Sequence, residues 1–260
     1  MNTFLLRSAL HHFAFARYWN GHRVHSPFVY DFVRHVVSRK ANDDKAALAV
    51  ARHYRRQLKE NSETIEIKDL GTGHDRHERI SRMARNASVS DKCGRLLMRI
   101  VKHYKPLNII EIGTSLGIST AYIAAPNIGT IHTIEGNPSS AEMARTQLSK
   151  AGIGNVKSYE GNFDEILPNI LRDVPHTSLA FVDGNHTYEA SMRYFNMIAD
   201  TAKCNETIIV FDDIHWSEGM QRAWNEIAAD NRVKTSIDLM HMGVVFFRSG
   251  CPKEHYSVRW

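Results

Sequence analysis

The sequence predicts an α/β protein with a doubly wound, mostly parallel sheet and an N-terminal helical extension. From residue 107 onward, short runs rich in β-branched residues alternate with segments of helical apolar periodicity. Such alternation requires crossover connections, which cover both faces of a parallel sheet with helices. The last two runs have no helix between them, so they can pair only as an antiparallel hairpin. Before residue 60, apolar residues recur at spacings of three and four, which is typical of helices.

Composition excludes several classes of protein. With 260 residues, 43% of them hydrophobic and 23% charged, the chain is neither disordered, collagen-like nor a coiled coil. Its longest apolar runs, such as 179–182 and 208–211, are far shorter than the roughly 18–20 residues of a membrane-spanning helix. Arg7, the His11–His12 pair and Arg17 interrupt the N-terminal segment, which therefore does not resemble an export signal. Three cysteines without CxxC spacing indicate no disulfide framework, so we expect a soluble, cytoplasmic protein.

Charge divides the chain into two halves. Residues 1–105 contain 21 Lys/Arg against 10 Asp/Glu, whereas residues 106–260 contain 12 against 18. A basic first half can attract anionic substrates, nucleic acid or a membrane surface, but it can equally be a solvated helix face. We interpret residues 1–90 as a basic helical cap and residues 91–260 as the main domain.

Each expected element follows from a local pattern. Helical periodicity occurs near residues 5–18, 28–37 and 46–58 and again over 92–104, while residues 61–90 are polar and irregular. The expected strands are 108–112, 130–135, 156–160, 178–183 and 207–212. The helices expected between and after them are 118–125, 139–151, 164–171, 188–202 and 218–229. The final hairpin pairs 234–240 with 244–248.

The junction after the first of these strands is a candidate ligand site. In a doubly wound sheet, ligands bind beyond the carboxyl ends of the strands. Gly113 and Gly117 allow a sharp turn there, and the amides that open the next helix favour an anionic group. The GxGxxG pattern of dinucleotide-binding loops is absent, and Glu111 precedes the loop, which suits an ammonium group. Glu135, at the end of the second strand, can bind both hydroxyls of a ribose.

Five segments at the ends of the expected strands carry a family resemblance. They are Glu111–Ser119, Ile134–Glu135, Glu160–Asn162, Phe181–Tyr188 and Val210–Asp213. In this order and spacing they resemble the motifs of class I S-adenosylmethionine-dependent methyltransferases. Within that superfamily the chain is most similar to the catechol and caffeoyl-CoA type and to bacterial O-methyltransferases that act on sugars and antibiotics. The resemblance covers roughly residues 88–250 and implies a Rossmann-like sheet of seven strands.

The resemblance implies S-adenosylmethionine as cofactor. Glu111 would hold its ammonium group, Glu135 its ribose, and the segment 161–163 would border its adenine. The full implied set of cofactor-binding residues is Glu111, Gly113, Thr114, Ser115, Gly117, Ser119, Glu135, Gly161, Asn162, Phe163 and Asp183.

Three carboxylates are expected to converge at the same edge of the sheet. Asp183 closes the fourth strand, and Asp212 and Asp213 close the fifth. Like charges this close repel one another unless something neutralises them, and Mg²⁺ prefers carboxylate oxygens. The sequence therefore leaves open a Mg²⁺ site formed by Asp183, Asp212 and Asp213, with capping as the other role for these acids.

A histidine stands three residues after the first of these acids. In the sugar-methylating relatives this position is a histidine, so the resemblance implies that His186, together with Asp183, is catalytic. Imidazole titrates near neutrality and can accept the proton of an acceptor hydroxyl. The alternative is a histidine hydrogen-bonded to the loop at 212–213. His215 and Trp216 are expected to border the acceptor pocket.

Two N-terminal features are interpreted as non-functional. The segment Asp69–His74 contains a glycine motif, but it lacks the strand-and-helix context of a cofactor loop and is expected to be a turn or lid edge. Eight histidines precede residue 80 without HxxxH or HExxH spacing, so no zinc site is expected in that region.

The sequence thus predicts an O-methyltransferase acting on a hydroxyl of an unidentified small molecule. The alternative is a non-catalytic protein of the same fold that binds nucleic acid or an anionic surface through its basic N-terminal region. The four residues Asp183, His186, Asp212 and Asp213 favour the enzyme. Nucleic acid is the disfavoured partner, and a homodimer is left open.

Overall fold

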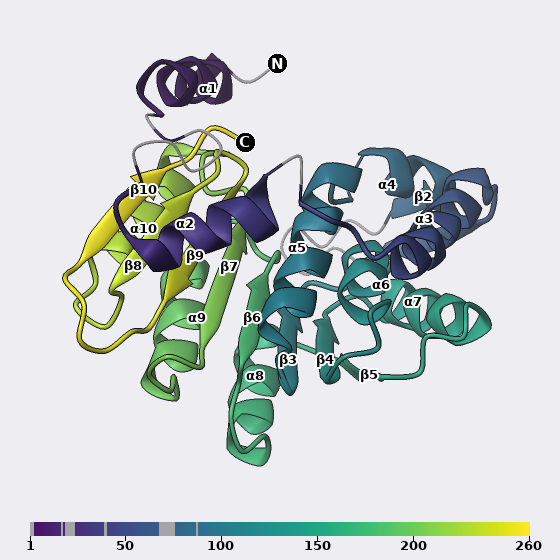
Figure 1. Cartoon of the computed structure of the whole chain (residues 1–260). Coiled ribbons are helices and arrows are strands. Elements are labelled where there is room, and N and C mark those ends of the chain that lie inside the picture. The colour runs from purple at the N-terminus through teal and green to yellow at the C-terminus, as the bar shows by residue number, and fades with distance from the viewer. Residues whose placement is uncertain (1–2, 17, 19–23, 39–40, 68–75, 87) are drawn as a thin grey trace. The chain divides into compact units, whose positions relative to one another are not determined.

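The computed structural model describes residues 3–16, 18, 24–38, 41–67, 76–86 and 88–260 (Figure 1). The chain folds as two compact units that do not follow chain order. One unit contains Met1–Asn42 and Val174–Trp260, and the other contains Asp43–Asp173. The basic extension is therefore divided between them. The functional boundary at residue 90 stays a prediction.

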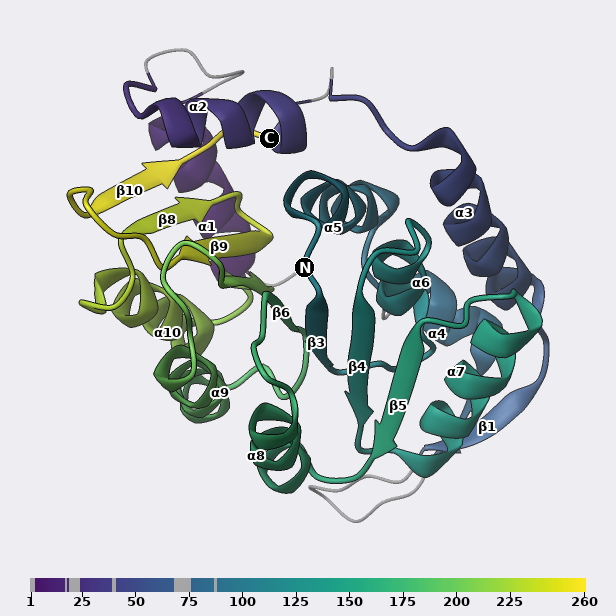
Figure 2. The ribbon, with the colours of Figure 1, turned by 60° about the horizontal axis from the view of Figure 1, so that its bottom comes forward.

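The unit 43–173 contains three parallel strands in the order β3, β4, β5 (Figure 2). These are β3 (Asn108–Ile112), β4 (Thr130–Glu135) and β5 (Val156–Glu160). Its helices are α3 (Lys45–Glu60), α4 (Ile80–Asn86), α5 (Asp91–Tyr104), α6 (Ile118–Ala124), α7 (Pro138–Lys150) and α8 (Phe163–Asp173). Two short strands, β1 (Thr64–Ile67) and β2 (Arg76–Arg79), form a separate antiparallel pair. Because Glu135 lies opposite Glu160, the carboxyl ends of β4 and β5 are level with each other.

The unit formed by 1–42 and 174–260 contains five strands in the order β10, β8, β9, β7, β6. These are β6 (Leu179–Val182), β7 (Ile208–Asp212), β8 (Thr235–Asp238), β9 (Met242–Phe246) and β10 (Glu254–Ser257). The helices are α1 (Thr3–Phe15), α2 (Pro27–Phe32), the π-helical turn η1 (Val33–Val37), α9 (Tyr188–Asp200) and α10 (Glu218–Ala229). Strand β9 is antiparallel to β7 and β8, whereas the pairs β6–β7 and β8–β10 are parallel.

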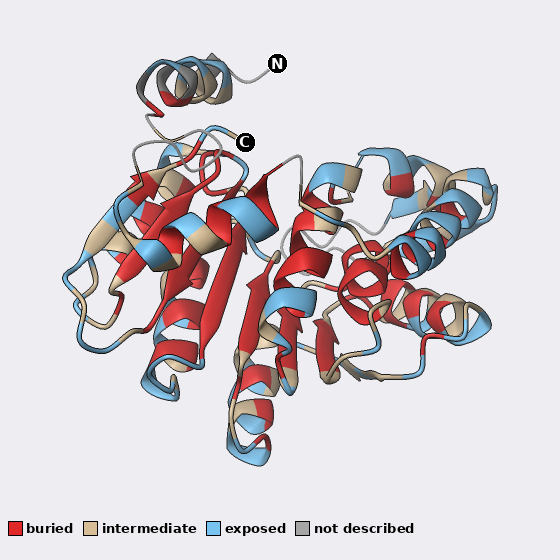
Figure 3. Cartoon of the chain, in the orientation of Figure 1, coloured by how far each residue is buried: buried red, intermediate tan, exposed pale blue. Residues whose placement is uncertain are grey.

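Apolar side chains fill the inside of each unit. Every residue of β6, β7, β8 and β9 is buried, as the red arrows of Figure 3 show. Helix α2 packs against β9 in the same unit through aromatic rings. Phe28 and Phe32 both contact Phe246 in edge-to-face geometry, with 4.9 and 5.3 Å between ring centroids. Within the described ranges, every helix is too short or too polar to cross a bilayer.

The structure confirms the α/β class, the mostly parallel strands and the antiparallel hairpin formed by β8 and β9. The expected number of strands was wrong by one, because three strands in one unit and five in the other make eight rather than seven. The additional strand, β10, buries only Tyr256, and its other three residues are exposed or half-buried. Residues 61–90 are also more regular than expected, since they include β1, β2 and α4. The glycine motif at 69–74 lies outside the described residues.

Candidate active site

The loop between β3 and α6 has the tight backbone that its glycines predict. Gly113, Ser115 and Gly117 all have positive φ angles, of 98°, 48° and 73°. The amides of Gly113 and Thr114 both donate to the carbonyl of Ile134 on β4, at 3.0 and 3.2 Å. The loop is therefore fixed to the neighbouring strand before the chain enters α6.

Glu111 lies fully buried beneath this loop. Its Oε2 accepts hydrogen bonds from the hydroxyls of Thr120 on α6 at 2.5 Å and Thr133 on β4 at 2.6 Å. Burial raises the pKa of this carboxyl, and the hydroxyl hydrogen bonds oppose that shift. Its other oxygen, Oε1, is buried and has no hydrogen-bond partner among the described residues. A buried carboxylate oxygen of this kind needs a donor, and the ammonium group of an amino-acid ligand would supply one.

Glu135 connects the loop to the start of α7. Its carboxylate accepts hydrogen bonds from the amides of Ser115 at 2.7 Å and Asn137 at 2.8 Å. Burial raises the pKa of Glu135, while those amide hydrogen bonds lower it. An ionised carboxylate has about four lone-pair sites, so the two amides leave acceptor capacity for ribose hydroxyls.

The third strand end completes the candidate cofactor region. Gly161 has a φ of 144° and donates from its amide to the carbonyl of Glu135. Asn162 is exposed and accepts from the amide of Asp164, which fixes the turn into α8, and Phe163 is half-buried at the start of that helix. The expected residues Glu111 to Phe163 therefore all lie in one unit, at or just beyond the carboxyl ends of β3, β4 and β5.

Tyr54 is a contact that sequence reasoning missed. This side chain on α3 is buried, and its hydroxyl donates to the carbonyl of Leu116 in the β3–α6 loop at 2.7 Å. A Cβ added to Gly117 would come within 2.9 Å of the Tyr54 hydroxyl, so the loop can approach α3 this closely only with glycine there. The apolar stripe of α3 predicts a buried tyrosine, but nothing in its spacing indicates which loop the hydroxyl contacts.

The other predicted residues lie in the unit formed by 1–42 and 174–260. Asp183 directly follows β6, and Asp212 ends β7, which pairs with β6 in parallel. Asp213 has a φ of 53° and starts the loop that leads to α10. The Nε2 atom of His186 lies 3.6 Å from Oδ1 of Asp183, and burial lowers the pKa of the imidazole although the charge of Asp213 opposes this. A neutral imidazole beside these carboxylates can accept a proton.

Asp212 is a buried carboxyl group beside a second acid. Burial and the adjacent charge of Asp213 raise its pKa to about 8. A divalent cation would relieve that repulsion, so the charge and the all-oxygen donor set fit Mg²⁺. The spacing fits less well, because in the described part of the chain the three acids do not form a group whose ligand atoms all lie within 4.8 Å of one another.

The residues expected to border an acceptor pocket have different surroundings. His215 is buried, and its Nε2 lies 2.8 Å from Oδ2 of Asp238. Trp216 is 49% exposed.

Part of the sequence is similar to known methyltransferases. Residues 110–214 match a family described as a methyltransferase domain. Over 89 residues the chain is 32% identical to a catechol O-methyltransferase of Niastella koreensis, which covers 33% of this chain and 40% of that protein. Over 63 residues it is 41% identical to a protein-L-isoaspartate O-methyltransferase of Methanocella arvoryzae, which covers 24% of this chain and 34% of that protein. The chain thus spans less than half the length of these curated relatives.

Solved structures share the fold over most of the chain. The O-methyltransferase TomG from Streptomyces achromogenes, solved with S-adenosylmethionine, aligns with a TM-score of 0.57 and 23% identity over 85% of this chain and 95% of its own. An O-methyltransferase from Bacillus cereus aligns with a TM-score of 0.55 and 18% identity over 84% and 97%. The chain therefore shares its fold with these solved structures. As the resemblance seen in the sequence predicted, residues 110–214 are similar to a methyltransferase domain.

The raised pKa of Asp212 predicts a pH-dependent stability. Between its ordinary pKa of 3.8 and its folded value of about 8, the folded chain binds a proton that the unfolded chain does not. Without divalent cations, the free energy of unfolding should therefore fall as pH rises through this window, by up to about 1.4 kcal/mol per pH unit. Urea denaturation of the wild type and Asp212→Asn in EDTA measures this, and the variant should have the flatter slope.

The exposed Asp173 provides the control, since it contacts only the neighbouring Arg172 among the ion pairs of the described residues. Asp173→Asn should retain the wild-type slope. Equal slopes for the wild type and Asp212→Asn would show that Asp212 is ionised in the folded protein.

Proposed function

We propose that the chain is an S-adenosylmethionine-dependent O-methyltransferase that methylates a hydroxyl of a small molecule. The observation that carries this proposal is the set of strand-end groups around the β3–α6 loop, above all the buried Glu111 oxygen without a partner. An unsatisfied buried carboxylate oxygen is costly unless a ligand donor completes it. The relatives named above are O-methyltransferases and support the same chemistry. A cytoplasmic location remains part of this proposal.

In the proposed reaction, one set of residues binds the methyl donor and another removes the proton of the acceptor. The acceptor oxygen forms a bond to the sulfonium methyl group while the carbon–sulfur bond breaks, so the sulfonium becomes a neutral thioether and the acceptor loses one proton. Such a displacement needs mainly alignment and a proton acceptor. Glu111 and Glu135 would hold the ammonium and ribose of the methyl donor, and Nε2 of His186 would take the proton.

The proposal includes a Mg²⁺ ion, with Asp183, Asp212 and Asp213 as its ligands. A bound divalent ion would supply positive charge that favours the ionised acceptor hydroxyl. If the acids bind it, Mg²⁺ should raise the stability of the wild type above pH 8, where Asp212 is mostly ionised and repelled by Asp213, and Asp212→Asn should lose that response. Full methyl transfer in EDTA would restrict the acids to a role without metal.

Removal of Glu135 tests the cofactor assignment. Glu135→Ala should weaken binding of S-adenosylhomocysteine by about 1.5–3 kcal/mol, because a charged acceptor of the ribose hydroxyls is lost. Calorimetric titration measures the change. Glu160 is the matched control, since it lies opposite Glu135 at the end of β5 but is exposed.

Glu160→Ala should bind like the wild type. No binding by the wild type would refute the cofactor assignment, and retention of nucleic acid in a salt-sensitive manner without methyl transfer would favour the non-catalytic alternative. Equal affinities of Glu135→Ala and the wild type would remove Glu135 from the site.

Tyr54 is predicted to position the cofactor loop from outside the binding site. Tyr54→Phe removes one neutral hydrogen bond to Leu116 and should weaken S-adenosylhomocysteine binding by about 0.5–1.5 kcal/mol. Tyr122→Phe is the control, because its hydroxyl donates to Asp91 at 2.7 Å and not to the loop. Both variants should lose stability, but only Tyr54→Phe should lose affinity. Parallel losses of affinity would indicate a general effect on the unit.

His186 is tested through the pH profile of methyl transfer. His186→Gln should lower turnover by about 10²–10⁴-fold while leaving cofactor affinity nearly intact. In the wild type the rate should fall on the acid side, with a midpoint below the ordinary histidine value of 6.5, because burial lowers the pKa of this imidazole. Radiolabelled methyl donor and a panel of catechols and sugars provide the assay.

His176→Gln is the matched control for this substitution. His176 precedes β6 at the end opposite Asp183, and burial lowers the pKa of its imidazole too. Its variant should keep both the rate and the acid limb. An acid limb that persists in His186→Gln would exclude His186 as the base without affecting the methyltransferase assignment.

A further inference from the structure

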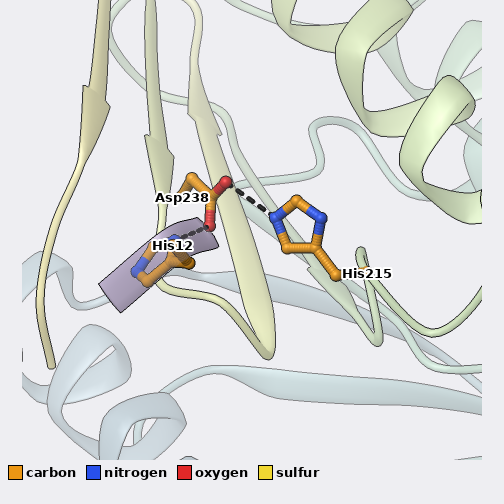
Figure 4. Close-up of side chains that lie close together, drawn as sticks. All are labelled: His12, His215 and Asp238. Carbon is orange, nitrogen blue, oxygen red and sulfur yellow. Dashed lines mark hydrogen bonds and ion pairs between the residues drawn. The ribbon is translucent and has the colours of Figure 1, made fainter. Parts of the chain in front are cut away.

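A second group of potential ligands lies away from the carboxylates of β6 and β7. His12 on α1, His215 in the loop after β7 and Asp238 at the end of β8 are all buried, and all three belong to the same unit. Each offers one nitrogen or oxygen atom, and these atoms all lie within 4.8 Å of one another. Figure 4 shows the Asp238 carboxylate directed at both imidazoles.

The hydrogen bonding of His12 calls for either a proton or a metal ion between its Nδ1 and Asp238. Nε2 of His12 lies 3.3 Å from the carbonyl oxygen of Val258, which can only accept, so this nitrogen carries the hydrogen. In a neutral ring, Nδ1 then presents its lone pair to Oδ1 of Asp238 at 3.3 Å. Two lone pairs at this distance repel unless a proton or a metal ion lies between them. Histidine ligands of metal ions commonly donate their other ring N–H to a backbone carbonyl, as His12 does here.

The carboxylate is held ready as a ligand. Its two oxygens face the two rings, Oδ1 toward Nδ1 of His12 and Oδ2 toward Nε2 of His215. Oδ1 also accepts from the amide of Met240 at 2.8 Å, which fixes the orientation of the carboxylate. Nε2 of His215 lies 2.8 Å from Oδ2, while its Nδ1 is buried without a partner among the described residues.

Two imidazoles and one carboxylate favour a borderline transition-metal cation over Mg²⁺. Mg²⁺ prefers oxygen ligands and bound water, whereas Zn²⁺ takes histidine nitrogen and carboxylate oxygen at about 2.0–2.2 Å. Around a tetrahedral ion these bond lengths place ligand atoms about 3.3–3.6 Å apart. The 3.3 Å from Asp238 to His12 lies at the lower end of that range and the 2.8 Å to His215 lies below it, so side-chain rotations would have to open the second distance.

We propose that His12, His215 and Asp238 bind one Zn²⁺ ion, with the fourth position open to water. The ion would connect α1 to the loop after β7 and to the end of β8. It is distinct from the proposed Mg²⁺ site in both residues and ligand chemistry. Histidine spacing near the N-terminus gives no sign of it, because the three ligands come from distant segments of the chain.

Metal binding by the full chain tests the proposal. The protein is stripped with a chelator and titrated with Zn²⁺, with bound metal measured by elemental analysis after dialysis and stability measured by thermal unfolding. The wild type should bind one equivalent and melt at a higher temperature with Zn²⁺, because the ion binds the folded state. His12→Ala and His215→Ala should bind at least 10-fold more weakly and lose the thermal response.

His35→Ala is the matched control, because His35 is an exposed N-terminal histidine that pairs with Asp31. It should respond to Zn²⁺ like the wild type. If the alanine variants unfold, Asp238→Asn and the absorption spectrum of the Co²⁺-substituted wild type replace them, since a tetrahedral Co²⁺ site absorbs strongly in the visible range.

Three results would overturn the proposal. The first is a wild type that binds no Zn²⁺ and shows no thermal response. His12, His215 and Asp238 would then be held together by hydrogen bonds and ion pairs alone. The second is the same Zn²⁺ response in His12→Ala and the wild type, which would place the ion elsewhere. The third is a Co²⁺ spectrum unchanged by Asp238→Asn. None of these results bears on methyl transfer, so the inference and the proposed function fail independently.

Discussion

The arrangement of the β3–α6 loop depends on a single buried carboxyl group. Glu111 is fully buried, and burial of a carboxylate costs several kcal/mol unless hydrogen bonds compensate. Thr120 and Thr133 supply those bonds from α6 and β4, and the hydroxyls of Thr114 and Thr133 lie 2.5 Å apart. The strand, the loop, the next helix and the neighbouring strand are thus joined through one side chain. Among the described residues, Oε1 of Glu111 has no hydrogen-bond partner, and the proposed ligand ammonium group would supply one.

The other unit uses buried acids in two opposite ways. Asp212 and Asp238 are both buried at strand ends, yet the pKa of Asp212 is raised to about 8 and that of Asp238 is lowered. The difference follows from their neighbours, since Asp212 lies beside another acid and Asp238 between two imidazoles. Ionised Asp212 would therefore be stabilised by an added positive charge. Asp238 already lies beside two imidazoles, which can carry a positive charge themselves or bind a metal ion instead. The ligand chemistry of the two places differs for the same reason.

Sequence patterns predicted those parts of the structure that rest on local periodicity. The ranges 108–112, 130–135 and 156–160 agree with β3, β4 and β5 residue for residue, because each is a short run bounded by turn residues. The pattern missed β2 and β10, whose sequences RHER and EHYS have no apolar run. These strands form because a partner strand is available, and pairing with a partner leaves no periodic signal in a short polar segment.

The same limit applies to the sites. Candidate residues in a loop of fixed local geometry, such as Gly113 and Gly117, are visible in the sequence because that geometry restricts the residue type. Tyr54 and His12 act through contacts with segments far away in the chain, and neither the helical stripe of α3 nor the spacing of the histidines encodes those contacts. Their roles could be found only once the distances were known.

The loop after β7 connects Asp212 and Asp213 to Asp238, which lies in the same unit. Asp212 and Asp213 open this loop, His215 lies two residues further on, and the amide of Trp216 donates to the carbonyl of Asp213 to close a turn. A turn this short transmits a constraint at His215 directly to Asp213, whose φ of 53° is already restricted. Whatever holds His215 against Asp238 and His12 therefore also limits where the candidate catalytic acids can lie. In this way helix α1, which contains none of the predicted catalytic residues, is connected through His12 and Asp238 to the loop that Asp212 and Asp213 open.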